Sequence, residues 1–457
     1  MATRSVKTEF GPLLRLASPI VLVQVGMMAM SVVDTALVGR VSAGALAAVA
    51  LGQTLFFGAA VFGMGALMAL DPVVAQAHGA GDREGVGRGV QRGLVLSAAL
   101  TVPCSLALVP AGPILGLLGQ PGEVVPIAGD CALASIPGIF PFLAFTVFRQ
   151  SLQAMHRIAP IVAAMFAALV AHVLLCWAMV FGHAGLPAMG AVGAAWAGSI
   201  SRWLMALGLL AAAWPDLKPL LLPWRRSSFE GGPLIRMLRL GAPIGTQFLL
   251  EFGAFAVIGL LMGRLGANEL AGHQIALSLA SLTFMVPLGV SAAAAVRVGN
   301  AVGEGDMTAA RRAAAASMAC GVLFMALTAA LFMSAPGILA RLYTTDAGAF
   351  EVAAVLIPLA GVFQIFDGLQ VVSTGILRGS GDTRAPMLIN VLGFWLIGMP
   401  VSLVMAFSMG AGPAGLWWGL VVALVVVSAS LLARVRSKLR GEIARVRVDG
   451  RAETQDP

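Results

Sequence analysis

The chain has 457 residues, of which 59% are hydrophobic and 11% are charged. Soluble domains carry roughly 25% charged residues, so this composition excludes an ordinary soluble protein and indicates a polytopic membrane protein. The four cysteines stand singly in apolar runs, without the spacing of a zinc site or a disulfide framework, and the sequence contains no HExxH, GxxxxGK or GxSxG motif. We therefore expect neither a cofactor nor an enzyme.

Hydropathy predicts twelve membrane spans. A spanning helix needs about 20 mainly apolar residues, and the chain contains twelve such stretches. In chain order, the predicted spans are residues 12–36, 45–72, 89–112, 125–148, 160–182, 188–212, 235–262, 270–296, 310–333, 350–376, 386–408 and 413–433. The predicted fold class is an all-α polytopic membrane protein, and the basic N-terminus leads into the first span without the features of a cleaved signal.

Basic residues predict the orientation. All but four of the 29 Lys and Arg lie in alternate connections or in the two terminal segments, and the four exceptions are Arg40, Arg202, Arg264 and Arg341. Because cytoplasmic loops are enriched in Lys and Arg, we expect a cell (inner) membrane protein with both termini in the cytoplasm. This topology also accounts for the net charge of +8, so we expect a lipid bilayer and no nucleic acid as partner.

The sequence divides into two similar halves. The stretch LLRLASPI at Leu13 recurs as MLRLGAPI at Met237, and LVGRVSAGALA at Leu37 recurs as LMGRLGANELA at Leu261. An even number of spans per half makes the halves parallel repeats, which predicts two six-helix lobes around a central cleft and a transporter that works by alternating access. The predicted domains are an N-terminal lobe at 1–214, a cytoplasmic linker at 215–233, a C-terminal lobe at 234–434 and a basic cytoplasmic tail at 435–457.

Four ionisable residues fall within predicted spans, namely Asp34, Arg202, Glu251 and Asp367. A charge at mid-bilayer costs about 2.5 to 3.5 kcal/mol on insertion scales, so such residues usually face a cavity or a partner. None of the three acids recurs in the other half, which suggests function added to a duplicated scaffold. The alternative is that a fixed neighbour neutralises each acid, which then only holds helices together. For Asp34 this neighbour could be Arg40, six residues further along the chain. For Arg202 we favour extension to the cytoplasmic interface or pairing with an acid.

Buried acids also suggest how transport is driven. Desolvation favours the protonated form of a carboxylate, and carboxylate oxygens are hard ligands for a small cation, so such acids suit a coupling site for H+ or Na+. The sequence has no nucleotide-binding motif that would supply another energy source. The chain also contains 22 Met and 22 Phe, whose adaptable apolar surface permits a promiscuous pocket for cationic compounds.

Glycines and prolines give two further expectations. The glycine-rich stretches 79–89 and 302–312 are read as turns in which Asp82 and Asp306 cap the following helices, rather than as phosphate sites. Pro19 and Pro243 occupy equivalent positions in the first span of each half, where a lost backbone hydrogen bond permits a kink. Bending of span one near Asp34 is a candidate gate, and a static kink is the alternative.

Several long motifs resemble one known family. They are VDTALVGR in span one, GAPIGTQFLLEFGAF in span seven, AGHQIALSLASLTFMVPLGVSAAAAVRVGNAVGEGD in span eight and FQIFDGLQVVSTGILRGSGDTRAPM in span ten. Together with twelve spans in two halves, they resemble the multidrug and toxic compound extrusion (MATE) family, NorM-like branch. The resemblance extends over nearly the whole chain.

This resemblance implies export of cationic, mostly aromatic compounds in exchange for Na+ or H+. The cation-site Glu and Asp of the family fall on Glu251 and Asp367. The functional Asp of span one falls on Asp34, and the helix-bending Pro falls on Pro19. We expect no metal site beyond a possible Na+ at Glu251 and Asp367, and we expect a monomer.

The sequence departs from the family in the stretch expected to face Asp34, where relatives often have Asn and this chain offers His172 and Cys176. We expect Asp34 and His172 to form a proton or substrate site, and a packed histidine without a transport role is the alternative. Two other functions stay open at this point. One is a flippase for lipid-linked precursors in the same superfamily, and the other is a polytopic membrane enzyme that acts on lipids.

Overall fold

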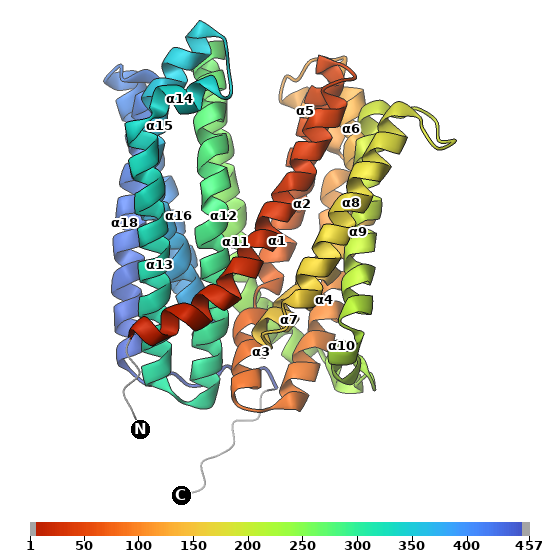
Figure 1. Cartoon of the computed structure of the whole chain (residues 1–457), viewed down its shortest axis with the longest axis vertical. Helices are drawn as coiled ribbons and strands as arrows, with labels where there is room; N and C mark the ends of the chain where they lie inside the picture. The colour runs from red at the N-terminus through yellow and green to blue at the C-terminus, as the bar shows by residue number, and fades with distance from the viewer. Residues whose placement is uncertain (1–5, 450–457) are drawn as a thin grey trace, which may run out of the picture. The chain divides into compact units, whose positions relative to one another are not determined.

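The computed structural model describes residues 6–449, and this part of the chain is built of helices joined by short turns (Figure 1). The first half contains α1 (Val6–Val38), α2 (Ala43–Leu67), α3 (Leu70–Gly79), α4 (Arg83–Leu108), α5 (Ala111–Leu117), α6 (Val124–Ser135), η1 (Ile136–Gly138), α7 (Ile139–Ala154), α8 (Ala159–Phe181), α9 (Gly190–Ala212), α10 (Trp214–Leu221) and η2 (Arg226–Phe229). The second half contains α11 (Gly231–Leu265), α12 (Ala267–Glu304), α13 (Met307–Ser334), α14 (Pro336–Arg341), α15 (Ala347–Gly379), α16 (Arg384–Val391), η3 (Leu392–Gly398), α17 (Met399–Leu403), η4 (Val404–Ser408) and α18 (Gly412–Arg440).

The twelve predicted spans are confirmed. Within residues 6–449, twelve helices are long and apolar enough to cross a membrane, and each overlaps one predicted span, with ends that differ by a few residues. Some spans contain more than one helix. Pro137 separates α6 from α7 through a short 3₁₀ turn, and Pro400 lies at the start of α17 between two π-helical stretches. Proline lacks the N–H that would continue the α-helical hydrogen bonds, so these interruptions follow from the sequence.

The chain forms two compact units. Within the described residues, the C-terminal unit consists of residues 6–21 together with Thr246–Arg445, and the N-terminal unit consists of Leu22–Gly245 together with residues 446–449. Both α1 and α11 pass from one unit to the other. In each helix the passage comes two residues after a proline, Pro19 or Pro243, that the repeat relates. The predicted linker 215–233 lies inside the N-terminal unit, where it forms α10 and η2.

Small residues allow helices to approach closely inside each unit. In the N-terminal unit, a Cβ on Gly241 of α11 would lie only 1.9 Å from the carbonyl oxygen of Ala66. In the C-terminal unit, a Cβ on Gly375 of α15 would lie 2.3 Å from the carbonyl oxygen of Ser291. Close backbone contact of this kind is the usual way helices pack in lipid, where apolar surface alone supplies no driving force for association. Helix α15 packs against α12, α13 and α18 in this unit (Figure 1).

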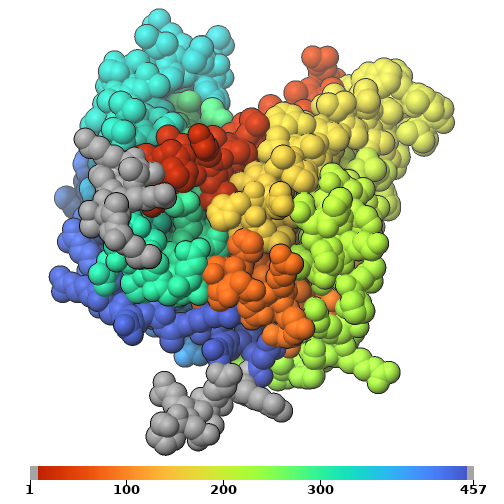
Figure 2. Space-filling view, turned by 60° about the horizontal axis from the view of Figure 1, so that its bottom comes forward, coloured from red at the N-terminus to blue at the C-terminus, as the bar shows by residue number. Residues whose placement is uncertain are grey.

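The linker is fixed to α4 by one buried glutamine. Gln91 donates to the carbonyl oxygens of Leu220 and Leu221 at 3.0 and 3.1 Å. Its side-chain oxygen accepts from the backbone N–H of Arg225 at 3.1 Å and from the hydroxyl of Ser228 at 2.7 Å. Figure 2 shows α4 (orange) beside α10 (green) on one face of the unit.

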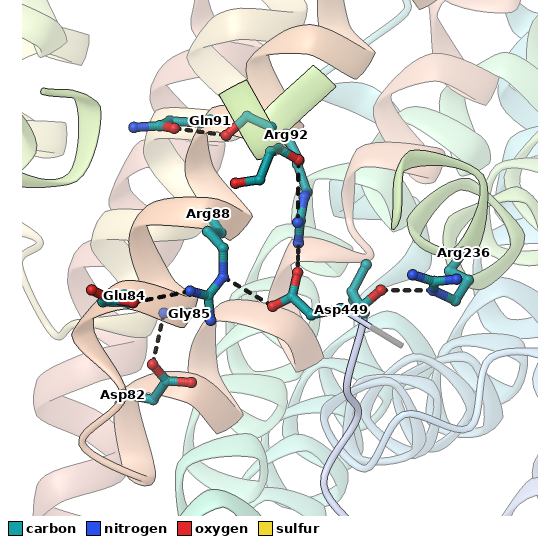
Figure 3. Close-up of polar contacts among 11 residues, drawn as sticks. Asp82, Glu84, Gly85, Arg88, Gln91, Arg92, Arg236 and Asp449 are labelled. Carbon is teal, nitrogen blue, oxygen red and sulfur yellow. Dashed lines mark hydrogen bonds and ion pairs between the residues drawn. The ribbon is translucent and has the colours of Figure 1, made fainter. Parts of the chain in front are cut away.

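A short stretch after α18 also packs on this unit. The backbone N–H of Val446 donates to Gln76 Oε1 at 2.7 Å, and Arg236 Nε donates to the carbonyl oxygen of Val448 at 2.7 Å. Asp449 lies between Arg88 Nε at 2.9 Å and Arg92 Nη1 at 2.5 Å (Figure 3). We name Val446–Asp449 the docked segment. Residues 1–5 and 450–457, which include the end of the predicted basic tail, lie outside the described residues.

The expected helix caps are confirmed. Asp82 accepts a hydrogen bond from the N–H of Gly85 at 2.7 Å at the start of α4 (Figure 3). Asp306 accepts one from the N–H of Ala309 at 2.8 Å at the start of α13. In both turns the aspartate satisfies an N–H that the first helical turn leaves without a partner.

Candidate functional site

A polar cluster inside the N-terminal unit surrounds Asp34 of α1. His172 Nε2 lies 3.0 Å from Asp34 Oδ1, and Gln53 Nε2 donates to Asp34 Oδ2 at 2.7 Å. The thiol of Cys176 donates to Asp34 Oδ1 at 3.5 Å. His172 and Cys176 face the same carboxylate because residues four apart lie on one side of a helix. The structure thus brings Asp34 and His172 together, with only 7% of Asp34 and 1% of His172 exposed.

The imidazole of His172 is also fixed from its other side. Nδ1 lies 3.1 Å from the hydroxyl oxygen of Ser201 on α9. With Asp34 ionised, Nε2–H donates to the carboxylate, which leaves Nδ1 of a neutral ring to accept from Ser201. A proton added at Nδ1 would make both ring nitrogens donors while Ser201 turns its hydroxyl to accept. The pair therefore can take up a proton without losing a hydrogen bond.

A small cavity of about 30 Å³ adjoins this cluster. Its lining includes Asp34, Gln53, Phe56, Ser135 and Arg202. The guanidinium carbon of Arg202 lies 3.8 Å from the centre of the Phe56 ring. The expected extension of Arg202 along α9 to the membrane interface is therefore wrong, because the guanidinium turns into the unit toward α2.

The C-terminal unit holds a second polar cluster around Glu251 of α11. Gln370 Nε2 donates to Glu251 Oε1 at 2.9 Å and to Asn390 Oδ1 at 2.6 Å. Gln247, one turn before Glu251, lies on the same side of α11. Gln370 Oε1 is buried and has no hydrogen-bond partner among the described residues. The cluster therefore joins α11, α15 and α16 and leaves one amide oxygen available.

Asp367 lies in the same unit, three residues before Gln370 on α15. It is partly buried, and the charge of Glu251 on α11 acts on its carboxylate. A proton or a small cation bound beside both carboxylates reduces the repulsion between them.

Pro19 lies within the continuous helix α1, on the C-terminal-unit side of the passage between Val21 and Leu22. It is fifteen residues before Asp34, so about four turns of helix separate the two. The structure thus does not bring Pro19 next to the N-terminal cluster but places it on the same helix. Among residues 6–449, no three His, Cys, Asp or Glu side chains gather as a metal-ligand set.

Several members of the two clusters were not predicted. These members are neutral, so charges within predicted spans do not reveal them: Gln53, Ser201, Gln370 and Asn390. The sequence feature that could have indicated them is an amide or hydroxyl side chain inside an apolar run. Arg149 was counted in a cytoplasmic connection, because the predicted fourth span ends at residue 148. The structure instead includes it in α7, where it is buried and its Nη1 donates to Gln24 Oε1 at 2.8 Å.

Comparison with known proteins agrees with these features. The chain matches the MatE family over residues 19–178 and 243–404. It is 38% identical over 443 residues to a probable multidrug resistance protein NorM of Bradyrhizobium diazoefficiens, covering 94% of each chain. It is 32% identical over 438 residues to the multidrug resistance protein MdtK of Edwardsiella ictaluri, covering 94% of this chain and 95% of that one.

A solved structure is also similar. The eukaryotic MATE transporter AtDTX14 superposes with a TM-score of 0.88 at 26% sequence identity, covering 95% of this chain and 98% of that one. The agreement in sequence extends over both halves of the chain, and the agreement in structure includes its twelve apolar helices. The chain therefore belongs to the MatE family of multi-pass membrane transporters.

Proposed function

We propose that the protein is a secondary active antiporter that exports cationic, aromatic compounds, including drugs, in exchange for Na+ or H+. Its membership of the MatE family and its likeness to proteins named for multidrug resistance support the export of varied compounds. Export follows from the coupling, because an antiporter that takes up Na+ or H+ down its inward gradient moves the substrate outward. The protein acts as a transporter and not as an enzyme.

The observation that carries the proposal is the oxygen-rich cluster of the C-terminal unit. Glu251 and Asp367 bring two acids to one unit, and the amide of Gln370 holds the Glu251 carboxylate at 2.9 Å. Hard oxygen atoms of carboxylates and amides suit a small cation, and paired buried acids suit a proton. We propose that binding of either ion relieves the repulsion between the acids and favours the state that releases substrate.

The N-terminal unit supplies a second element of the proposal. Asp34 and His172 form a pair that can gain or lose a proton while keeping their hydrogen bonds, with Ser201 at the other ring nitrogen. Histidine is suited to this task because its ordinary titration range lies near neutral pH. We propose that this pair takes up a proton or contacts the substrate during the cycle.

Alternating access requires the two units to move relative to each other. Two helices contain a position at which they could bend during this movement. The helices α1 and α11 change unit two residues after Pro19 and Pro243, respectively. A proline inside a helix weakens the backbone hydrogen bonds of the turn before it, so bending there costs less than elsewhere in the helix. We propose Pro19 as the gate on span one.

Transport assays in everted vesicles test the proposal. We expect ethidium uptake, which corresponds to export from a cell, under an imposed Na+ gradient or pH gradient. Asp367→Asn and Glu251→Gln should abolish coupled transport while the protein is still inserted. The matched control is Glu351→Gln on α15, which removes an exposed acid from the same helix as Asp367. Undiminished coupled transport in both site variants would contradict the mechanism, and dye flux that ignores both gradients would favour the flippase or the enzyme.

A further inference from the structure

Arg202 is a charged residue deep in the membrane that the proposed cycle does not use. It lies about 18 Å along α9, a 23-residue helix that is about 34 Å long. A charge at such a depth costs about 2.5 to 3.5 kcal/mol on insertion scales. Its surroundings must therefore compensate the charge.

Two glycines and one aromatic ring form the place that Arg202 occupies. A Cβ on Gly138 would lie 3.1 Å from Arg202 Cδ and Nη1, and a Cβ on Gly198 would lie 3.5 Å from Nη1. The missing side chains leave room for the guanidinium, which lies 3.8 Å from the centre of the Phe56 ring. This distance is well inside the range of about 6 Å for a cation–π interaction. Phe142 in turn packs edge-on against Phe56, with ring centres 5.8 Å apart.

Arg202 contacts this ring directly, whereas Asp34 in the same cavity attracts its charge without forming an ion pair. Within residues 6–449 no ion pair or hydrogen bond to its side chain is formed, and its buried Nη1 has no partner among them. A bidentate Arg–carboxylate contact would fix the guanidinium in one geometry, whereas a cation–π contact is weaker and less directional. Another cation can therefore take the place of the guanidinium on the Phe56 ring.

The same cavity contains the two groups that an organic cation needs. It is lined by the acid Asp34 and by the aromatic Phe56, and Arg202 lines it with them. Its volume of about 30 Å³ holds one or two water molecules, which leaves no space for an aromatic compound. A cationic substrate therefore reaches these groups only after Arg202 has moved away.

We propose that Arg202 is a resident cation that competes with cationic substrates for the Asp34–Phe56 cavity, and so determines which compounds the N-terminal unit accepts. The inference rests on the proposed function, because it takes organic cations as the substrate class. By like-charge repulsion and by occupying the Phe56 face, Arg202 weakens the binding of simple organic cations. Uncharged aromatic compounds lose less binding affinity, because the charge of Arg202 does not repel them.

Equilibrium binding to the purified protein tests this inference without any ion gradient. Arg202→Met keeps an unbranched stem but removes the guanidinium and its charge, and we expect it to lower the Kd for ethidium at least tenfold. The Kd for an uncharged aromatic dye of similar size should change less than twofold. Arg202→Lys keeps the charge and should stay within about threefold of the wild-type Kd for ethidium. Size-exclusion chromatography and circular dichroism establish that each variant is folded, and Arg202→Gln replaces Arg202→Met if the latter is not.

Arg341→Met is the matched control. Arg341 also stacks on a phenylalanine, with its guanidinium carbon 5.5 Å from the centre of the Phe350 ring, but it belongs to the C-terminal unit, whereas Asp34 belongs to the N-terminal unit. We expect its removal to leave ethidium binding unchanged. Unchanged or weaker ethidium binding in a folded Arg202→Met or Arg202→Gln protein would overturn the inference. An equal gain for the uncharged dye would also overturn it, because the variant would then only have enlarged the cavity.

The outcome is separable from that of the proposed function. If vesicles show gradient-driven export but loss of Arg202 brings no gain in ethidium affinity, the inference fails and the antiport proposal stands. If the gain appears but neither gradient drives transport, the antiport proposal fails and the role of Arg202 stands.

Discussion

Removal of the Asp449 carboxylate tests how firmly the docked segment Val446–Asp449 is held. In Asp449→Ala the segment loses its ion pairs with Arg88 and Arg92, at 2.9 and 2.5 Å. The side chain of Asp449 is 45% exposed, and Arg88 keeps a second acid, Glu84, at 3.2 Å. This first pair therefore contributes little, about 0 to 1 kcal/mol.

Arg92 is different because only 3% of its side chain is exposed. Without Asp449 it keeps a contact with the carbonyl oxygen of Ser227 at 3.4 Å, which is a weak substitute for a carboxylate. Leaving a buried donor poorly paired costs about 1 to 3 kcal/mol. The two effects together amount to about 1 to 4 kcal/mol, which predicts that the docked segment opens about 5 to 700 times more readily.

Hydrogen–deuterium exchange measures this opening directly. The N–H of Val446 donates to Gln76 Oε1 in the wild type, so its exchange reports docking. Exchange over residues 446–449 should speed up by the stated factor in Asp449→Ala. The matched control is Glu442→Ala, which removes an exposed acid four residues before Val446. Equal exchange in the wild type and in Asp449→Ala would refute the reasoning, since the carboxylate would then not hold the segment.

Three further predictions concern the C-terminal cluster, the gate and the helix packing. Gln370→Leu removes the amide that holds Glu251 and Asn390, and we expect it to raise the coupling-ion concentration for half-maximal transport roughly tenfold, since a lost hydrogen bond to a charged group costs about 1.5 to 3 kcal/mol. Pro19→Ala restores a backbone N–H within α1, and it should slow transport several-fold with little change in ethidium affinity. Gly241→Val adds a Cβ that would lie 1.9 Å from a carbonyl oxygen, and it should lower the melting temperature or prevent folding.

Each of these changes has a control in the same helix. Gln364→Leu removes a buried amide of α15 that contacts Thr283 and not Glu251, so it should leave the ion dependence unchanged. Pro12→Ala alters α1 before the gate and should not slow transport. Gly259→Val alters α11 where a Cβ meets nothing within 4 Å. The interpretation of a cluster, a gate or a close contact fails if the variant and its control behave alike.

The parts of the fold set by hydropathy could be predicted from the sequence. Spans follow from the length and polarity of local segments, and the repeat identified Pro19 and Pro243 as equivalent before the structure showed that both helices change unit just after them. The acids were found because a charge in an apolar run is conspicuous. Asp34 and His172 lie together as expected. Cys176, one turn further along α8, faces the same carboxylate.

Contacts set by packing could not be predicted. Arg202 turns toward Phe56 because Gly138 and Gly198 leave space beside it, and nothing in the local sequence of α9 shows where the glycine of another helix will lie. The amides of Gln370 and Asn390 meet through the arrangement of three helices. Arg149 was assigned to a loop because hydropathy places the end of a span only to within a few residues.

The central claim is that one protein exchanges an organic cation for Na+ or H+. The most direct test uses proteoliposomes that contain the purified protein, with no imposed ion gradient and with ethidium on one side only. We predict that the downhill movement of ethidium drives Na+ or H+ in the opposite direction, measured with an ion-sensitive dye. We also predict that Glu251→Gln abolishes this ion movement. Downhill movement of ethidium without any counter-movement of Na+ or H+ would contradict antiport.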